Sequence, residues 1–409
     1  MNSGFDRTRR VIRRPHYSSQ FSSNLLSVVT CYSANLSIRI GSKGARSIDP
    51  GFPASVDERS NRNHGFARIM IKVTALTSGR NVPSSRFRVR QFIEPLANLG
   101  IQVSEYPLRL RKYTPNISPP IRFLLNSAKT AARVPGLLAA RTSDITWLER
   151  ELVPRRFTLE RRAGSKQLFD VDDAIWLTGD PGFSEEIATK SYGVIAGNEF
   201  LAEHYRSVGA RAWVVPTSID TDRWQPGPKP EDDSWVIGWT GTSSNLPSLE
   251  SLEEPLADFL AQHPETKLLV VCDRRPSLKK IPPAQWSFER WSSAREVQLV
   301  QRMNVGLMPL PDTEWSLGKC AFKMIVYMAV GIPVVVSPIG ANKNILQQAD
   351  VGLAAVMAND WYEALRLLFC DRKRAASLGS AGRQLVEEGY SVRKNTGALA
   401  RIFKEAAGF

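Results

Sequence analysis

Short apolar segments alternate with helical patterns along most of the chain, and this alternation constrains the fold most strongly. The first series of predicted strands lies at residues 71–76, 101–106, 145–148, 167–171, 193–196 and 212–216. Helical patterns at residues 87–99 and 200–208 fall between these strands, and each is followed by a glycine. Such βα alternation predicts a parallel sheet that is covered by helices on both faces.

A stretch rich in proline and acidic residues, QPGPKPEDDS at residues 225–234, predicts a linker between two domains. A second series follows it, with predicted strands at residues 235–239, 267–272, 305–309 and 333–337 and predicted helices at 248–262, 294–303, 321–330, 361–369 and 372–388. We therefore expect an α/β protein with two Rossmann-like, doubly wound domains that face each other across a cleft. Ligands of such sheets bind at the carboxyl ends of the strands.

The expected domains are an N-terminal domain over residues 69–224, a C-terminal domain over 235–395 and a last helix within 396–409 that crosses back to the first domain. Residues 1–68 differ, since they are rich in Ser, Arg and Asn and carry 11 Lys and Arg against 4 Asp and Glu. We expect a disordered basic extension there. Two alternatives stay open: a secretory signal, and a start codon assigned too far upstream, because Met70 directly precedes the first strand.

Composition excludes several classes of protein. No apolar run reaches the length of about 18 residues that a membrane-spanning helix needs. The cysteines are too far apart to suggest a zinc site or a disulfide framework, which favours a reducing cytoplasm: Cys31, Cys272, Cys320 and Cys370. The four histidines form no pattern typical of a catalytic triad. Half of the net charge of +14 lies in residues 1–68, so charge alone does not lead us to expect a nucleic-acid partner.

Two lysines at the start of the helix predicted at residues 321–330 are the first candidate site. Lys319 and Lys323 are four residues apart and would share one helix face. Free N–H groups at a helix start attract anions, and two ammonium groups there would strengthen a diphosphate site. The alternative, two solvated surface charges, is disfavoured because cations oppose the helix dipole at this end. Small residues after the next strand, Gly340 and Asn342 among them, would let a nucleotide approach closely.

A second candidate segment, GWTGTSSN at residues 238–245, follows the first strand of the second domain. Gly241, Thr242 and Asn245 would surround phosphate or sugar oxygens, and an ordinary βα turn with a helix cap is the alternative. The chain has neither the GxGxxG pattern of a dinucleotide site nor the GxxxxGK[ST] pattern of a P-loop.

Polar residues at strand ends of the first domain are candidates for binding the acceptor. Asp170, Asp172 and Asp173 come at the end of the strand at 167–171, Arg86 follows the first strand, and Asn198 occupies an equivalent strand end. Carboxylate clusters of this kind also bind divalent metals, and Asp173 also suits a helix cap. We expect an acceptor-orienting or structural role and no metal.

Several segments resemble one family of enzymes. They are GLMPL at 306–310, Trp315, KCAFK at 319–323, YMAVGIPVV at 327–335 and SPIG at 337–340, together with SSRFR at 84–88, DVDDAIW at 170–176 and GNEFLAEHY at 197–205. These segments resemble the group 1 (family 4-like) glycosyltransferases of GT-B architecture, over residues 69–405.

The resemblance implies that the C-terminal domain binds a nucleotide-sugar donor and the N-terminal domain binds the acceptor, with retention of anomeric configuration and no metal. Lys319, Lys323 and the loop at residues 241–242 would face the donor diphosphate and neutralise its charge as it leaves. Most of the family has two glutamates that correspond here to Gly318 and Val326. We expect Asp312 or Glu314 to replace one of them.

We therefore expect a retaining, metal-independent glycosyltransferase of the hexosyltransferase type, without a cofactor. It would act in polysaccharide biosynthesis on a glycan, lipid-linked or small-molecule acceptor, in the cytoplasm or at the inner face of the membrane. Apolar residues alternate with Arg and Lys at residues 121–138, which leaves peripheral membrane contact open beside an ordinary packed helix. The missing glutamates motivate an alternative function, nucleotide or nucleotide-sugar binding without catalysis.

Overall fold

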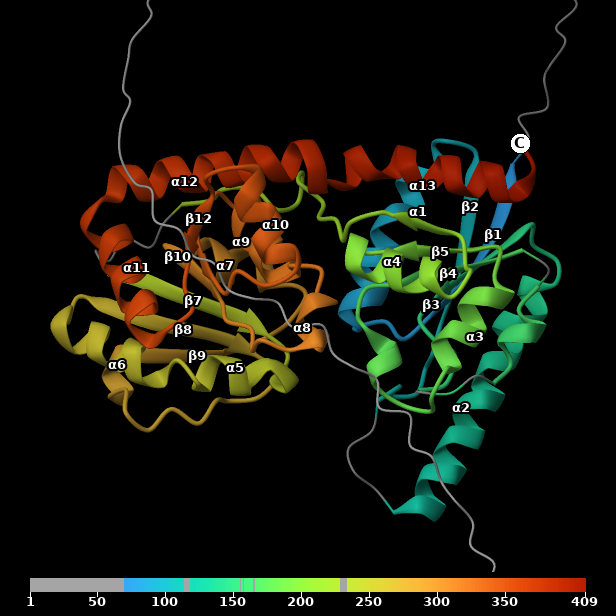
Figure 1. Cartoon of the computed structure of the whole chain (residues 1–409), viewed down its shortest axis with the longest axis horizontal. Coiled ribbons are helices and arrows are strands. Elements are labelled where there is room, and N and C mark those ends of the chain that lie inside the picture. The colour runs from blue at the N-terminus through green and yellow to red at the C-terminus, as the bar shows by residue number, and fades with distance from the viewer. Residues whose placement is uncertain (1–69, 114–117, 155, 157, 165, 229–233) are drawn as a thin grey trace, which may run out of the picture. The chain divides into compact units, whose positions relative to one another are not determined.

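The computed structural model describes residues 70–113, 118–154, 156, 158–164, 166–228 and 234–409. These residues contain two parallel sheets of six strands each (Figure 1). The extension predicted at residues 1–68 and most of the acidic part of the predicted linker lie outside the described residues. The α/β class and the two doubly wound sheets are confirmed.

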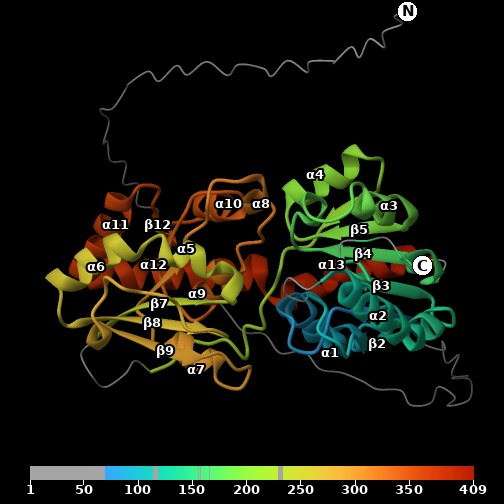
Figure 2. The same cartoon turned by 90° about the horizontal axis from the view of Figure 1, so that it is seen from below.

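The first sheet has the strand order β2-β1-β3-β4-β5-β6. Its strands are β1 (Ile71–Thr77), β2 (Ile101–Pro107), β3 (Ile145–Glu149), β4 (Gln167–Val171), β5 (Gly193–Ala196) and β6 (Ala212–Val214). Figure 2 shows β2, β3, β4 and β5 following one another across the sheet. The order reverses between β1 and β3, and such a reversal opens a crevice at the carboxyl ends of the two strands.

The second sheet repeats this plan with the order β12-β11-β10-β7-β8-β9. Its strands are β7 (Trp235–Gly241), β8 (Thr266–Cys272), β9 (Trp286–Arg290), β10 (Val305–Met308), β11 (Val334–Val336) and β12 (Gly352–Ala354). The reversal here lies between β7 and β10, so the loops after these strands border the equivalent crevice.

Helices cover both faces of each sheet because the buried strands are apolar on both sides. On the first sheet, α1 (Ile93–Ala97) and α13 (Val392–Ala407) pack on one face, and α2 (Pro119–Ala140), α3 (Phe183–Lys190) and α4 (Glu199–Ser207) pack on the other. On the second sheet, one face carries α7 (Glu296–Gln301), α9 (Phe322–Ala329) and α10 (Ala341–Gln348). The other face carries α5 (Leu246–Glu250), α6 (Glu253–Gln262), α11 (Ala358–Cys370) and α12 (Arg372–Leu385), while α8 (Glu314–Leu317) is a single turn before α9.

Some elements differ from the sequence-based expectation. The helix predicted at residues 87–99 is divided into a π-helical turn (Ser85–Val89), a 3-10 turn (Arg90–Phe92) and α1. Pro95 has no N–H group to continue the helical hydrogen bonds, which accounts for the division. Strands β9 and β12 were not predicted, because they lie at the sheet edges and are only partly buried, so they lack a continuous apolar run.

The last helix, α13, contributes to the core of the first sheet. The ring of Phe403 packs edge-on against Trp147 of β3 with 5.0 Å between ring centroids, and both side chains are fully buried. A π-helical turn at Val386–Tyr390 connects α12 to α13. Among the described residues, no helix combines the length and apolar character that a membrane span requires.

We expect Phe403→Ala to lower the free energy of unfolding by about 3–5 kcal/mol, because it leaves a cavity in the core of the first sheet. Phe409→Ala is the control, since that ring is 64% exposed and its removal should change little. Urea denaturation of both variants measures the difference. Equal stabilities would show that α13 does not pack on the sheet in solution.

Candidate active site

A cleft of about 1940 Å³ lies at the carboxyl ends of the strands of both sheets. Segments that follow β1, β2, β3 and β4 border it from the first sheet, and segments that follow β7 and β8 border it from the second, together with α8 and the start of α9. Both strand-order reversals therefore open into the same cleft, which is the location that topology alone predicts for a ligand.

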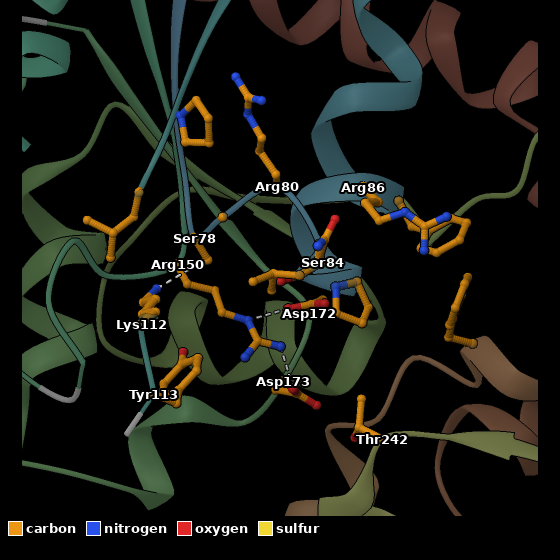
Figure 3. A pocket seen from close by; sticks show the side chains of 18 of the residues that line it. Ser78, Arg80, Ser84, Arg86, Lys112, Tyr113, Arg150, Asp172, Asp173 and Thr242 are labelled. Atoms are coloured by element: carbon orange, nitrogen blue, oxygen red, sulfur yellow. Dashed lines mark hydrogen bonds and ion pairs between the residues drawn. The ribbon is translucent and has the colours of Figure 1, made fainter. Parts of the chain in front are cut away.

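Ion pairs at the base of the cleft connect the two sheets. Arg150, which directly follows β3, donates from Nε to Asp172 Oδ1 at 2.6 Å and also pairs with Asp173. Lys319, from the segment before α9, donates to Asp173 Oδ1 at 2.8 Å. Figure 3 shows Arg150 directed toward the two carboxylates. Arg150 has a φ of 57°, a left-handed conformation that is uncommon for residues other than glycine.

Burial and the surrounding charges together shift the pKa of these two carboxyl groups in opposite directions. Burial would raise the pKa of Asp173, but the Arg150 and Lys319 cations outweigh burial and lower it. Burial raises the pKa of Asp172, and the attraction of Arg150 only partly opposes this. Two of the three predicted acceptor-binding aspartates, Asp172 and Asp173, line the cleft. Each is already engaged by Arg150, which orients them rigidly.

Lys323 has a different environment from Lys319. Its Nζ lies 5.6 Å from the ring centroid of Trp239, and no carboxylate of the described residues is within ion-pair distance. Burial is the largest influence on Lys323 and the charge of Lys319 the next, and together they lower its pKa to about 8. A desolvated ammonium group without a counter-ion is unfavourable, so the site is electrostatically prepared for an anion.

The loop after β7 lies beside Lys323. A Cβ atom at Gly241 would approach Lys323 Cε to 2.9 Å, so glycine allows the lysine to lie against the strand end. Thr242 Oγ1 accepts from Asn245 Nδ2 at 2.8 Å, and Ser243 N donates to an Asp273 carboxylate oxygen at 2.6 Å. The predicted loop residues Gly241, Thr242 and Asn245 thus line the cleft, with Asp273 holding the loop.

The segment before α9 is docked on the first sheet. Asn198 Nδ2 donates to the carbonyl oxygens of Gly318 at 3.2 Å and Lys319 at 3.1 Å, and Cys320 Sγ donates to Asp172 O at 3.3 Å. Asn198 also caps α4 and is not part of the cleft lining. The structure therefore gives Asn198 contacts with the second half of the chain and places it outside the cleft lining.

Steric contact accounts for one of the two missing glutamates. A Cβ atom at Gly318 would lie 2.6 Å from Ala174 Cβ and 2.8 Å from Ala174 N, so no larger side chain fits. Val326 is buried and lines the cleft. Asp312 and Glu314 are exposed and lie outside the cleft lining, so the structure does not bring either one to the position of a missing glutamate.

Two predicted donor-binding residues, Gly340 and Asn342, make structural contacts outside the cleft lining. Gly340 has a φ of 53°, and a Cβ there would lie 2.8 Å from the Leu317 carbonyl oxygen, while buried Asn342 donates to Ser337 O at 3.1 Å. Neither Gly340 nor Asn342 lines the cleft.

Asp170 and Arg86 each form an ion pair. Asp170 is buried and accepts from Arg88 Nε at 2.7 Å and Trp147 Nε1 at 3.1 Å, and it is not part of the cleft lining. Burial raises its pKa to about 6. Arg86 does line the cleft, where its guanidinium forms a two-fold hydrogen bond with Glu296 of α7.

Sequence reasoning missed Arg150, the residue that organises the base of the cleft. The signal was the charged run Glu149-Arg150-Glu151, which stands directly after a predicted buried strand, as Asp172 and Asp173 do after β4. Within the described residues, no group of three or more His, Cys, Asp or Glu side chains is arranged to hold a metal ion.

Comparison with known proteins identifies the fold. No family model matches the sequence, and no curated protein matches it. Sucrose-phosphate synthase from Thermosynechococcus elongatus superposes with a TM-score of 0.61 at 14% identity, covering 82% of this chain and 98% of the synthase. HepE from Anabaena, solved in complex with UDP and glucose, has a TM-score of 0.59 at 13% identity and covers 82% and 99%. The chain has the GT-B fold.

A third GT-B neighbour is WaaG, a glycosyltransferase involved in lipopolysaccharide biosynthesis, with a TM-score of 0.59 at 13% identity over 81% of this chain and 99% of WaaG. Each of these neighbours is covered almost completely. The described part of the chain therefore contains the whole two-sheet GT-B architecture.

We expect Gly318→Ala to lower the free energy of unfolding by about 1–3 kcal/mol, because the added methyl group overpacks the contact with Ala174. The matched control is Gly397→Ala in α13, where a Cβ would meet nothing within 4 Å. Helix propensity predicts that this control gains about 0.5–1 kcal/mol. Chemical denaturation compares the two. A Gly318→Ala protein as stable as the wild type would contradict the docking of this segment on the first sheet.

Proposed function

We propose that the protein is a glycosyltransferase that uses a nucleotide-sugar donor. The observation that carries this proposal is Lys323 in the first turn of α9, a partly buried cation of a GT-B fold that lines the cleft beside the loop after β7 and has no counter-ion among the described residues. HepE, a neighbour with the same fold, was solved with UDP and with UDP-glucose. A diphosphate at Lys323 would supply the missing negative charge.

In this proposal Lys323 and Lys319 stabilise the nucleoside diphosphate as it leaves the sugar. Negative charge develops on the leaving diphosphate in the transition state, and fixed cations in a desolvated site stabilise that charge with little reorganisation. Lys319 is paired with Asp173 in this structure. The donor diphosphate would compete with Asp173 for this ammonium group, which links donor binding to the base of the acceptor side.

The same proposal covers the metal independence, the stereochemistry, the acceptor side and the location of the enzyme. The two lysines would take over the role of a metal ion, and transfer would proceed with retention of configuration in a hexosyltransferase-type reaction of polysaccharide biosynthesis. The acceptor would bind on the first-sheet side, where Asp172 and Asp173 are oriented by Arg150. Free thiols at Cys272, Cys320 and Cys370 favour a cytoplasmic location, at or near the inner face of the membrane.

A second candidate function is nucleotide binding without catalysis. It rests on Gly318 and Val326, which stand where most of the resembling family has glutamates. The close contact of Gly318 with Ala174 excludes a direct replacement by a larger side chain in this conformation. Turnover therefore distinguishes the two functions.

The first experiment screens UDP-, GDP- and ADP-sugars by thermal shift, since a ligand that binds only the folded state raises its melting temperature. Lys323→Ala is expected to weaken donor binding and to lower the turnover rate about 10²-fold or more, as the loss of one fixed charge-stabilising group does. Lys343→Ala, on the exposed face of α10, is the control and should behave as the wild type.

The outcomes separate the two functions. Binding without turnover in the presence of acceptor extracts would favour the non-catalytic function. The glycosyltransferase proposal is wrong if no donor binds or reacts and Lys323→Ala changes nothing.

The pKa of Lys323 predicts a pH dependence. The ammonium form binds the diphosphate, and because its pKa is lowered to about 8 the charge is lost as the pH rises through this value. We expect the affinity for the nucleoside diphosphate to fall by only about twofold between pH 7 and 8, where at least half of the lysine is charged, and by up to about tenfold per pH unit above. Calorimetric titration between pH 7 and 9.5 measures this fall.

Lys323→Arg should remove the fall, because a guanidinium stays charged over the whole range. An affinity that is the same at pH 7 and pH 9.5 in the wild type would exclude Lys323 as the titrating ligand.

A further inference from the structure

Three arginines line the first-sheet side of the cleft and have no ion-pair partner among the described residues. Arg80 follows β1, and Arg109 and Arg111 follow β2, the strand that pairs with β1 along its whole length. All three are exposed, line the cleft and form no ion pair with any described residue. Figure 3 shows the side chain of Arg80 extending away from the cluster around Arg150. Like charges that line one side of a cleft attract anionic ligands to it.

The carboxylates of the same cleft are already engaged. Each accepts a hydrogen bond or an ion pair from a neighbour: Glu105 from Arg90, Glu151 from Tyr113, Asp172 and Asp173 from Arg150, Asp273 from Ser243, and Glu296 from Arg86. The charges left without partners in the described lining are therefore positive. Lys323 is one of them, on the second-sheet side, and the three arginines lie across the cleft from it.

An apolar stripe on α2 leads away from this charged wall. Ile121, Leu124, Ala128, Ala131 and Pro135 follow one another at intervals of three and four residues, so they share one face of the helix. All five are exposed, with 53% of Ile121 and 69% of Leu124 accessible.

The cleft and the stripe are continuous. Ala131 and Pro135 line the cleft, and the stripe continues from them toward the start of α2, which extends from the first sheet in Figure 1. Leu110 and Tyr113, next to the arginines, add two half-exposed apolar surfaces at the cleft end. The opposite face of α2 packs on the sheet, where a Cβ at Gly136 would come within 2.6 Å of Leu76.

We propose that the acceptor is a lipid phosphate that also carries a hydroxyl group; its phosphate binds Arg80, Arg109 and Arg111, and its apolar chain lies along the α2 stripe. In the transfer, the bond between the sugar C1 and the donor diphosphate breaks, a bond between C1 and the acceptor hydroxyl oxygen forms, and the hydroxyl proton passes to the leaving diphosphate. This inference rests on the proposed function, because it names the class of acceptor for the same cleft. Charge complementarity selects the phosphate, since these three cations form no ion pair with any described residue. The continuity of the stripe with the cleft selects the apolar chain, because a soluble phosphorylated sugar would leave that surface exposed.

Calorimetric titration of the full chain with three probes tests the two parts separately. Decyl phosphate carries both parts, decyl glucoside carries the chain without the charge, and inorganic phosphate carries the charge without the chain. We expect decyl phosphate to bind at least about tenfold more tightly than either of the others, because charge-assisted contacts and apolar burial each contribute. Its affinity should also fall as salt is added.

Matched variants assign the binding to these residues. The double variant Arg109→Gln/Arg111→Gln should lower the affinity for decyl phosphate about tenfold or more, while Arg401→Gln, exposed on α13, should not change it. Leu124→Gln should lower it several-fold, and Leu367→Gln, 40% exposed on α11, is its control. Lys323→Ala should leave this affinity unchanged, which separates the lipid phosphate from the donor diphosphate.

Each alternative outcome overturns the inference. Equal binding of inorganic phosphate and decyl phosphate would point to a soluble phosphorylated acceptor. Equal binding of decyl glucoside would remove the role of the arginines, and an unchanged affinity of the double variant would place the probe elsewhere. Because nucleotide-sugar turnover is measured without these probes, a protein that turns over donor but ignores decyl phosphate keeps the proposed function and loses only this inference.

Discussion

The ion pairs of Asp173 with Arg150 and Lys319 are the interaction on which the rest of the cleft depends. One carboxylate receives a cation from each half of the chain. Taking three charged groups out of water is costly, and a network of this kind is favourable only when every member is paired. The network therefore holds the segment before α9 against the end of β4. Lys323, four residues further along the chain, also lines the cleft but has no carboxylate of the described residues within ion-pair distance.

The division between paired and unpaired charges gives the cleft its chemical character. Each carboxylate that lines the cleft is paired with a neighbouring side chain or N–H group. The cations without a partner among the described residues lie at two separate places, Lys323 near the second sheet and the arginines near the first. Two anionic groups, the donor diphosphate and a phosphate on the acceptor, would thus bind at different ends of one cleft. Asp172 and Asp173 lie between them, oriented by Arg150.

Close packing explains why glycine stands at position 318, where most of the resembling family has glutamate. Gly318 touches Ala174 of the other half, so its small size permits the docked segment with Lys319, Cys320 and the carbonyl groups that Asn198 binds. The substitution of glutamate by glycine at this position is thus part of the contact between the halves. In the proposed function, donor contacts would come from other groups, and Lys323 and the loop after β7 line the cleft.

The sequence by itself determined the two α/β halves, most of their strands, and the segments that border the cleft, because strand periods and strand ends depend on local pattern. It also placed Lys323, Gly241 and the aspartates correctly at strand or helix ends. Only the tertiary structure decided which charges are paired. Lys319 and Asp173 are 146 residues apart, and Arg150 reaches Asp172 through the pairing of β3 with β4. Such partners are set by strand order and by contact between the halves, and no local pattern encodes either. Only the tertiary structure therefore showed that Asp170 is buried, that Gly340 and Asn342 make structural contacts, and that the cleft arginines have no ion-pair partner among the described residues.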